Sequence, residues 1–135
     1  MRIVIDTNVV ASAIFFGGRP AELLRMVIRH ELSAVATDEI IDEYQATVNY
    51  LLEKYDGRRL ELSIVPIFSA MEIIPATSRV EVCRDPDDNK FISCAVDGNC
   101  YYVVSGDKDL LSLEQYGDVK IITVTEFLEL FPNRN

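Results

Sequence analysis

Two acidic stretches enclose the most informative part of this chain: Arg84-Asp85-Pro86-Asp87-Asp88-Asn89 and Ser105-Gly106-Asp107-Lys108-Asp109. Between them lie an apolar helical pattern at residues 91–96 and a compact aromatic and β-branched pattern at residues 101–104. Acidic side chains therefore lie at the ends of buried helices and strands. Carboxylates normally remain where water solvates them, so their repetition at the ends of buried elements favours a bound cation.

Strand and helix patterns alternate outward from this segment along the whole chain. The expected strands cover residues 2–5, 33–36, a short part of 73–82, 101–104 and 120–122. One helix is expected directly after Asp6 and a second from Pro20 onward. Four more are expected at residues 38–55, 60–71, 87–97 and 107–111, and a capping box predicts a last helix after Thr123. This alternation predicts one domain over residues 1–135, an α/β fold in which a mostly parallel five-stranded sheet forms the middle of a three-layer α/β/α sandwich.

Composition narrows the chemistry that is available. With 49% hydrophobic and 26% charged residues the chain is typical of a globular protein, and it contains no apolar run of about 18 residues. We therefore expect a cytoplasmic protein without a membrane segment. The three cysteines are expected to be small buried side chains in a reducing compartment. His30 is the one histidine, which argues against histidine metal sites and Ser-His-Asp catalysis and leaves oxygen ligands.

Four acidic residues are expected to meet at one edge of the sheet. Asp6 and Asp107 end strands, Glu43 lies in the second turn after a strand, and Asp88 opens a helix. In an α/β sheet such positions face one crevice at the carboxyl ends of the strands. Two carboxylates about 4 Å apart repel by roughly 4 kcal/mol at an effective dielectric near 20, and a divalent cation removes that conflict. Carboxylate and amide oxygens favour magnesium or manganese.

Each of these acids also has a structural interpretation. Asp6 and Asn8 suit a turn or a helix cap, and Asp107 after a glycine suits a tight turn or a cap. The acids in residues 85–88 crowd a helix start, where the helix dipole favours them. Glu43 alone could be a solvated helix residue. What departs from these interpretations is the joint pattern, in which four acids fall at the same end of successive strand-helix units.

At this point the chain resembles a known family, the PIN-domain ribonucleases, and in particular the toxin components of VapBC-like toxin-antitoxin pairs. The resemblance covers essentially the whole chain and rests on five stretches, at residues 3–8, 37–44, 85–95, 104–111 and 121–128. It implies an acidic tetrad whose members would be catalytic and hold the metal, with three further residues in supporting roles. The tetrad is Asp6, Glu43, Asp88 and Asp107, and the supporting residues are Asn8, Ser105 and Asp85.

The resemblance further implies single-stranded RNA as substrate, Mg²⁺ or Mn²⁺ as cofactor, a homodimer, and a cognate antitoxin protein that blocks the site. The formal net charge of −9 has the wrong sign for tight binding of RNA by the bare protein, because lysine and arginine contacts dominate phosphate binding. Bound cations would reverse the local charge. The net charge therefore suits an enzyme that cuts a structured or narrowly chosen RNA.

Two other interpretations compete with the nuclease. In a haloacid-dehalogenase-like phosphatase Asp6 would be a covalent nucleophile, but the residue two positions later is Asn8, so the general acid is missing and Glu43 has no role. A non-catalytic module would be either a receiver-like domain with Asp6 as a regulatory carboxylate or a PIN fold that only binds a partner. The four clustered acids argue against the binding scaffold, because binding alone does not require them.

Overall fold

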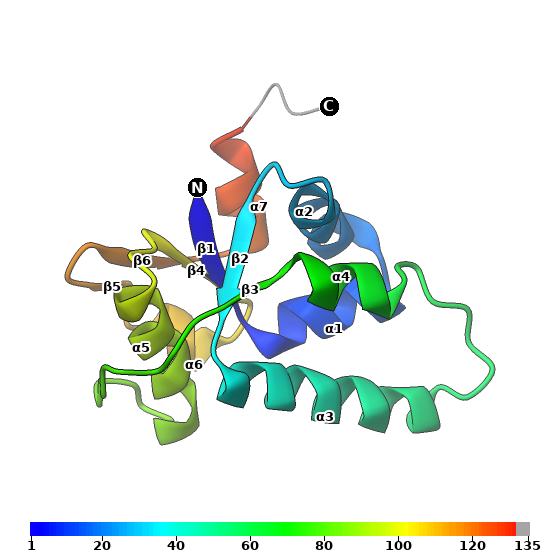
Figure 1. Ribbon diagram of the computed structural model, residues 1–135, viewed down its shortest axis with the longest axis horizontal. Helices are drawn as coiled ribbons and strands as arrows, with labels where there is room; N and C mark the ends of the chain where they lie inside the picture. Colours follow the sequence, from blue (N-terminus) through cyan, green and yellow to red (C-terminus); the bar gives the residue numbers. More distant parts are fainter. Residues whose placement is uncertain (132–135) are drawn as a thin grey trace.

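The computed structural model describes residues 1–131, and strands and helices alternate along them as the sequence predicts (Figure 1). No helix in this range is long and apolar enough to cross a membrane. In chain order the elements are β1 (Arg2–Ile5), α1 (Thr7–Phe15), α2 (Gly18–Ile28), β2 (Ser33–Ala36), α3 (Asp38–Lys54), α4 (Ile64–Ala70), β3 (Glu72–Ile73), the 3₁₀ turn η1 (Pro86–Asp88), α5 (Asn89–Asp97), β4 (Tyr102–Val104), α6 (Lys108–Leu111), β5 (Gln115–Tyr116), β6 (Val119–Ile122) and α7 (Val124–Glu129).

The sheet has the strand order β3-β2-β1-β4-β6-β5, and every pairing is parallel except that of β5 with β6. The α/β fold with a mostly parallel sheet is therefore confirmed. The sheet has one strand more than the five expected, because the two-residue strand β5 forms a hairpin with β6. Gly117, at a φ of 57°, lies in the turn of that hairpin, where the backbone conformation favours glycine.

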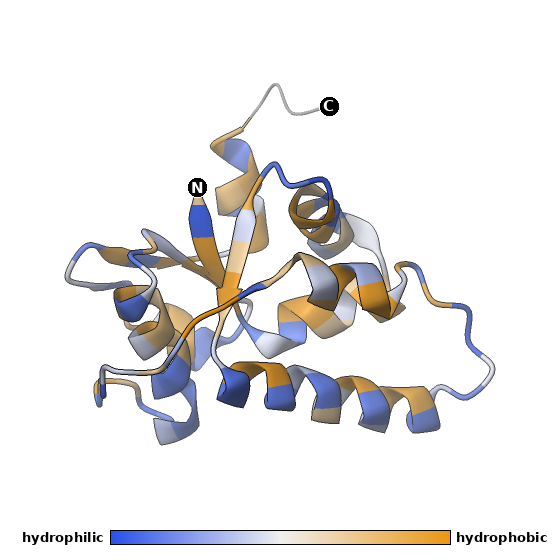
Figure 2. Ribbon diagram, viewed as in Figure 1, coloured by the Kyte–Doolittle hydropathy of each residue, from blue (hydrophilic) through white to orange (hydrophobic). Residues whose placement is uncertain are grey.

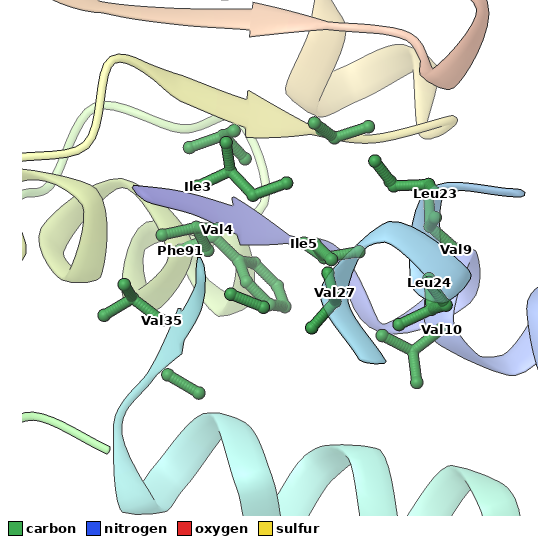
Figure 3. Packing of buried hydrophobic residues seen from close by; sticks show 14 of the residues in the cluster. Ile3, Val4, Ile5, Val9, Val10, Leu23, Leu24, Val27, Val35 and Phe91 are labelled. Carbon is green, nitrogen blue, oxygen red and sulfur yellow. The ribbon is translucent and has the colours of Figure 1, made fainter. Parts of the chain in front are cut away.

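Helices cover both faces of the central strands. Strand β1 is buried along Ile3, Val4 and Ile5, as expected for a strand covered on both sides. Helix α5 packs against β1, β2, β4 and β6, and Figure 3 shows its Phe91 beside Val4, while Leu24 and Val27 of α2 lie toward Ile5. Because successive side chains of a strand point to opposite faces, one four-residue strand contributes to two layers of the core.

Helix α3 carries the clearest amphipathic pattern in the chain. The Thr37 hydroxyl caps it by accepting a hydrogen bond from the backbone N–H of Ile40 (3.4 Å), and Ile40, Tyr44 and Val48 are buried. Figure 2 shows the hydrophobic residues of α3 mainly on the side toward α1 and α4. The buried Tyr44 hydroxyl donates to the carbonyl of Ile5, which ties the first turns of α3 to the end of β1.

Three expected boundaries differ from the structure. Helix α4 covers only residues 64–70 of the expected 60–71, and Pro66 lies in its first turn, where its missing N–H costs no helical hydrogen bond. The third strand is reduced to residues 72–73, and the expected strand residues near Val80 form no strand. We propose that residues 1–135 form one domain, supported by a single hydrophobic cluster. Residues 132–135 of that range lie outside the described part of the chain.

Candidate active site

The carboxyl ends of the parallel strands place the predicted acids at one edge of the sheet. The chain runs from β1 through β2 to β3 on one side of β1, and then returns to form β4 on its other side. The strand order therefore reverses between β1 and β4. In open α/β sheets ligands bind in the crevice at this topological switch point. Asp6 follows β1 and Ser105 follows β4, so both residues lie at that point.

Asp6 is buried, with 5% of its surface exposed, and its side chain makes no capping hydrogen bond to α1. The backbone N–H of Asp6 donates to the carbonyl of Val104 (2.9 Å), and its Oδ2 accepts from the hydroxyl of Ser105 (2.7 Å). Burial raises the pKa of the Asp6 carboxyl, and the nearby Asp107 and Glu43 raise it further, against the lowering effect of the Ser105 hydroxyl. Asp6 is the N-cap residue of α1, but its carboxylate makes no capping hydrogen bond, so capping alone does not explain why this side chain is buried.

Asp88 lies where η1 meets α5, is 8% exposed, and has no capping role toward α5. Its buried Oδ2 has no hydrogen-bond partner among the described residues. Burial raises the pKa of the Asp88 carboxyl to about 6, and Asp107, Asp6 and Asp85 raise it as well. A buried carboxylate oxygen without a donor is costly, because desolvation is not compensated. A hard cation is a partner that would compensate such an oxygen.

The structure separates Asp88 from its two acidic neighbours. Asp85 and Asp87 are exposed, and the Asp85 side chain caps η1 by accepting from the backbone N–H of Asp87 (3.0 Å). Asp85 thus holds the turn in which Asp88 is buried. The supporting role of Asp85 remains a prediction, and its cap on η1 shows how it would act, by fixing the turn that holds Asp88.

Asp107 lies in the turn between β4 and α6 and is partly buried. Its backbone N–H donates to Ser105 Oγ (3.0 Å), and its Oδ1 accepts from the backbone N–H of Asp109 (2.9 Å). Asp107 therefore caps α6, as its structural interpretation predicts, while the Ser105 hydroxyl connects it to Asp6. Ser105 is fully buried, so the hydroxyl orients two acids at once.

Glu43, on α3, differs from the three aspartates because protein donors engage both of its oxygens. Oε2 accepts from the Thr7 hydroxyl, and Oε1 lies 2.6 Å from the ammonium of Lys90. Lys90 and Thr7 were not predicted as site residues. The Glu43–Lys90 pair joins residues that are far apart in sequence, so only the packing of α3 against α5 reveals it. The only indication of Lys90 in the sequence is its position two residues after Asp88.

The remaining supporting residue, Asn8, is exposed and lines a groove of about 800 Å³ beside the acids. Arg19, Ser105, Asp107, Lys108 and Thr123 also line this groove. Arg19 and Lys108 are exposed. The groove therefore leads from the acidic residues, at the carboxyl ends of β1 and β4, to a basic side chain at the start of α2.

The donor set suits a hard divalent cation, although no group of three His, Cys, Asp or Glu side chains in residues 1–131 is placed so that it could hold a metal ion as it stands. The fit comes from Asp88, whose Oδ2 lacks a donor, and from the raised carboxyl pKa values of Asp88 and Asp6. Both features indicate buried carboxyl groups whose negative charge protein groups compensate only in part. Oxygen donors of this kind favour Mg²⁺ or Mn²⁺.

Comparison with known proteins identifies the family of this chain. The PIN domain family matches residues 2–109, so the chain belongs to the PIN domain family. PIN domains are generally nucleases. The chain is also 33% identical over 143 residues to the uncharacterized protein MJ1680 of Methanocaldococcus jannaschii, an alignment that covers 97% of this chain and 92% of that protein. No solved structure matches the chain.

Proposed function

We propose that this PIN domain is a metal-dependent endoribonuclease that hydrolyses phosphodiester bonds in single-stranded RNA. Its catalytic residues would be Asp6, Glu43, Asp88 and Asp107. The observation that carries the proposal is the buried Oδ2 of Asp88, which has no hydrogen-bond partner in residues 1–131, in a carboxyl whose pKa the charges of Asp107 and Asp6 raise. A haloacid-dehalogenase-like phosphatase is not proposed, because the family assignment gives its chemistry no support.

Asp6, Asp88 and Asp107 would hold Mg²⁺ or Mn²⁺. The resemblance also makes Glu43 a metal ligand, but both of its oxygens already have protein donors, Lys90 and Thr7. When bound, such a cation polarises a phosphate oxygen and lowers the pKa of a water molecule. The chain's own residues fix the geometry of the acids. Ser105 holds Asp6 by a 2.7 Å hydrogen bond, and the same oxygen accepts from the backbone N–H of Asp107, so the acids from β1 and β4 keep a defined relative position.

The groove beside Asp107 is where we expect the RNA strand to lie. Arg19 and Lys108 supply positive charge along a surface whose overall net charge is −9. Phosphate contacts by lysine and arginine provide most of the affinity of sequence-independent binding. Because these basic side chains are few, the bare protein would bind RNA weakly, and selectivity for a structured or narrowly chosen RNA follows.

We further propose that the protein is the toxin of a toxin-antitoxin pair, acts in the cytoplasm as a homodimer, and is blocked by a cognate antitoxin. The resemblance to VapBC-like toxins supports these assignments. The three cysteines are free, which suits a reducing compartment. Large apolar side chains on α3 and α4 are exposed, among them Tyr50 at 62% and Val65 at 74%, and a protein partner would cover them. Light scattering with size-exclusion chromatography tests the homodimer.

The experiment that tests the nuclease is cleavage of a mixed single-stranded RNA pool with Mg²⁺, with Mn²⁺ or with a chelator. We expect cleavage only with a divalent cation, and we expect Asp6→Asn and Asp107→Asn each to abolish it in folded protein. Asp42→Asn removes an exposed charge from α3 and should cleave normally. If the wild type cuts no RNA with either cation but still binds it, the chain is a non-catalytic binding module.

A further inference from the structure

Lys90 is a buried lysine that faces the acidic edge from the first turn of α5. Its side chain is 9% exposed. Its Nζ lies 2.6 Å from Glu43 Oε1, donates to the carbonyl of Asp87 (2.8 Å), and lies 3.4 Å from Asp87 Oδ1. A lysine ammonium has three protons to donate, and three acceptors surround this one. These contacts fix the ammonium of Lys90 beside Glu43 and Asp87.

The contacts of Glu43 contrast with those of Asp88. Glu43 Oε1 is paired with Lys90 and Oε2 accepts from the Thr7 hydroxyl, so both oxygens already have protein donors. Asp88 Oδ2 has none. For Glu43 to bind a metal ion, it would have to release the ammonium of a side chain that is only 9% exposed. Removing the partner of a buried charge is strongly unfavourable.

We propose that Lys90 is a built-in cation that keeps Glu43 out of the metal coordination shell, so that the site takes a single divalent cation held by Asp6, Asp88 and Asp107. This inference rests on the proposed nuclease function and deepens it by fixing the number of metal ions. A second divalent cation at Glu43 would lie against the ammonium, and like charges repel. Lys90 is then a positioning residue, which acts through Glu43 and not on the substrate.

Calorimetric titration with Mn²⁺ tests this assignment, because it counts metal ions without measuring activity. The wild type should bind one Mn²⁺ per chain. Lys90→Met replaces the ammonium with an apolar chain of similar length and should raise the count to two, because Glu43 is released to bind metal. Lys90→Arg keeps the positive charge and should bind one. The exposed Lys108 is the matched control, since Lys108→Met removes a lysine charge from the same edge and should also leave the count at one.

Glu43 provides the second half of the test. Glu43→Gln should change Mn²⁺ affinity by less than about tenfold, the lower limit for loss of a residue that supports a metal ligand. Asp88→Asn should abolish binding. Adding Glu43→Gln to Lys90→Met should restore a count of one, since the released carboxylate is gone. If Lys90→Met alone fails to fold, the Mn²⁺ affinity of Glu43→Gln still tests the proposal.

The outcomes separate this inference from the function on which it rests. Two Mn²⁺ ions in the wild type, loss of Mn²⁺ binding in Glu43→Gln, or a single Mn²⁺ in folded Lys90→Met would each overturn the role of Lys90 while leaving a metal-dependent nuclease intact. A wild type that binds no Mn²⁺ and cuts no RNA would overturn the proposed function, and the role of Lys90 with it.

Discussion

Replacing Asp88 by asparagine should stabilise the metal-free protein at neutral pH. Asp88 is buried, its Oδ2 has no donor, and its carboxyl pKa is raised to about 6 from an ordinary value of 3.8. The folded state therefore binds the Asp88 proton more tightly than the unfolded state does. Above pH 6 the ionised carboxylate opposes folding, so a variant without that charge should unfold less readily.

The size of the effect follows from the pKa difference. A pKa difference of about two between the folded and unfolded states corresponds to about 3 kcal/mol at a pH above both pKa values. Burying the polar asparagine amide also costs free energy, which reduces the net gain to about 2 kcal/mol. For a chain of this length that is a rise in Tm of about 6–10 °C. The gain should shrink as pH falls through 6 and should be absent below about pH 4, where Asp88 is protonated in both states.

Thermal unfolding with a chelator present, followed by circular dichroism between pH 4 and pH 8, measures this effect. Asp42→Asn removes an exposed charge of the same kind and should change Tm little. If Asp88→Asn is no more stable than the wild type at pH 8, or if its advantage does not depend on pH, Asp88 does not carry an uncompensated charge. A cation at this position would then have no support.

Three further predictions test the surrounding contacts. Ser105→Ala removes the hydroxyl that orients Asp6, and we expect Mn²⁺ affinity and RNA cleavage to fall by about 10–100-fold in folded protein; unchanged affinity would make the hydroxyl a packing group only. Tyr44→Phe removes a buried hydrogen bond to the end of β1 and should lower the free energy of unfolding, measured by urea denaturation, by about 1–2 kcal/mol. An unchanged free energy of unfolding would contradict a stabilising role for this hydrogen bond. Arg19→Ala should weaken RNA binding and lower the slope of log affinity against log salt by about one, whereas Arg29→Ala at the far end of α2 should do neither.

The sequence predicts most of the fold because local patterns and the packing requirement agree. The apolar residues of β1 and the stripe on α3 require burial, and the capping box at Thr123 and Glu126 forms as expected. Strand β5 was missed because two residues carry no periodicity. The start of α4 was misplaced because the apolar pattern continues through residues that form no helix.

The placement of the acids could be predicted only as far as the sheet edge. A parallel sheet brings strand ends together, which places Asp6 beside Ser105 and Asp107. The burial of Asp88, in contrast with the exposure of Asp85, depends on a single 3₁₀ turn that propensity does not specify. The pairing of Glu43 with Lys90 depends on how α3 packs against α5, which no local pattern encodes.

The most direct test of the central claim is binding of Mn²⁺ in solution, measured by the loss of the free-ion signal in electron paramagnetic resonance. The account predicts that the wild type and Asp42→Asn remove free Mn²⁺ to the same extent and that Asp88→Asn does not. Equal depletion by the wild type and Asp88→Asn, or no depletion by the wild type, would contradict the assignment of these acids as a metal site.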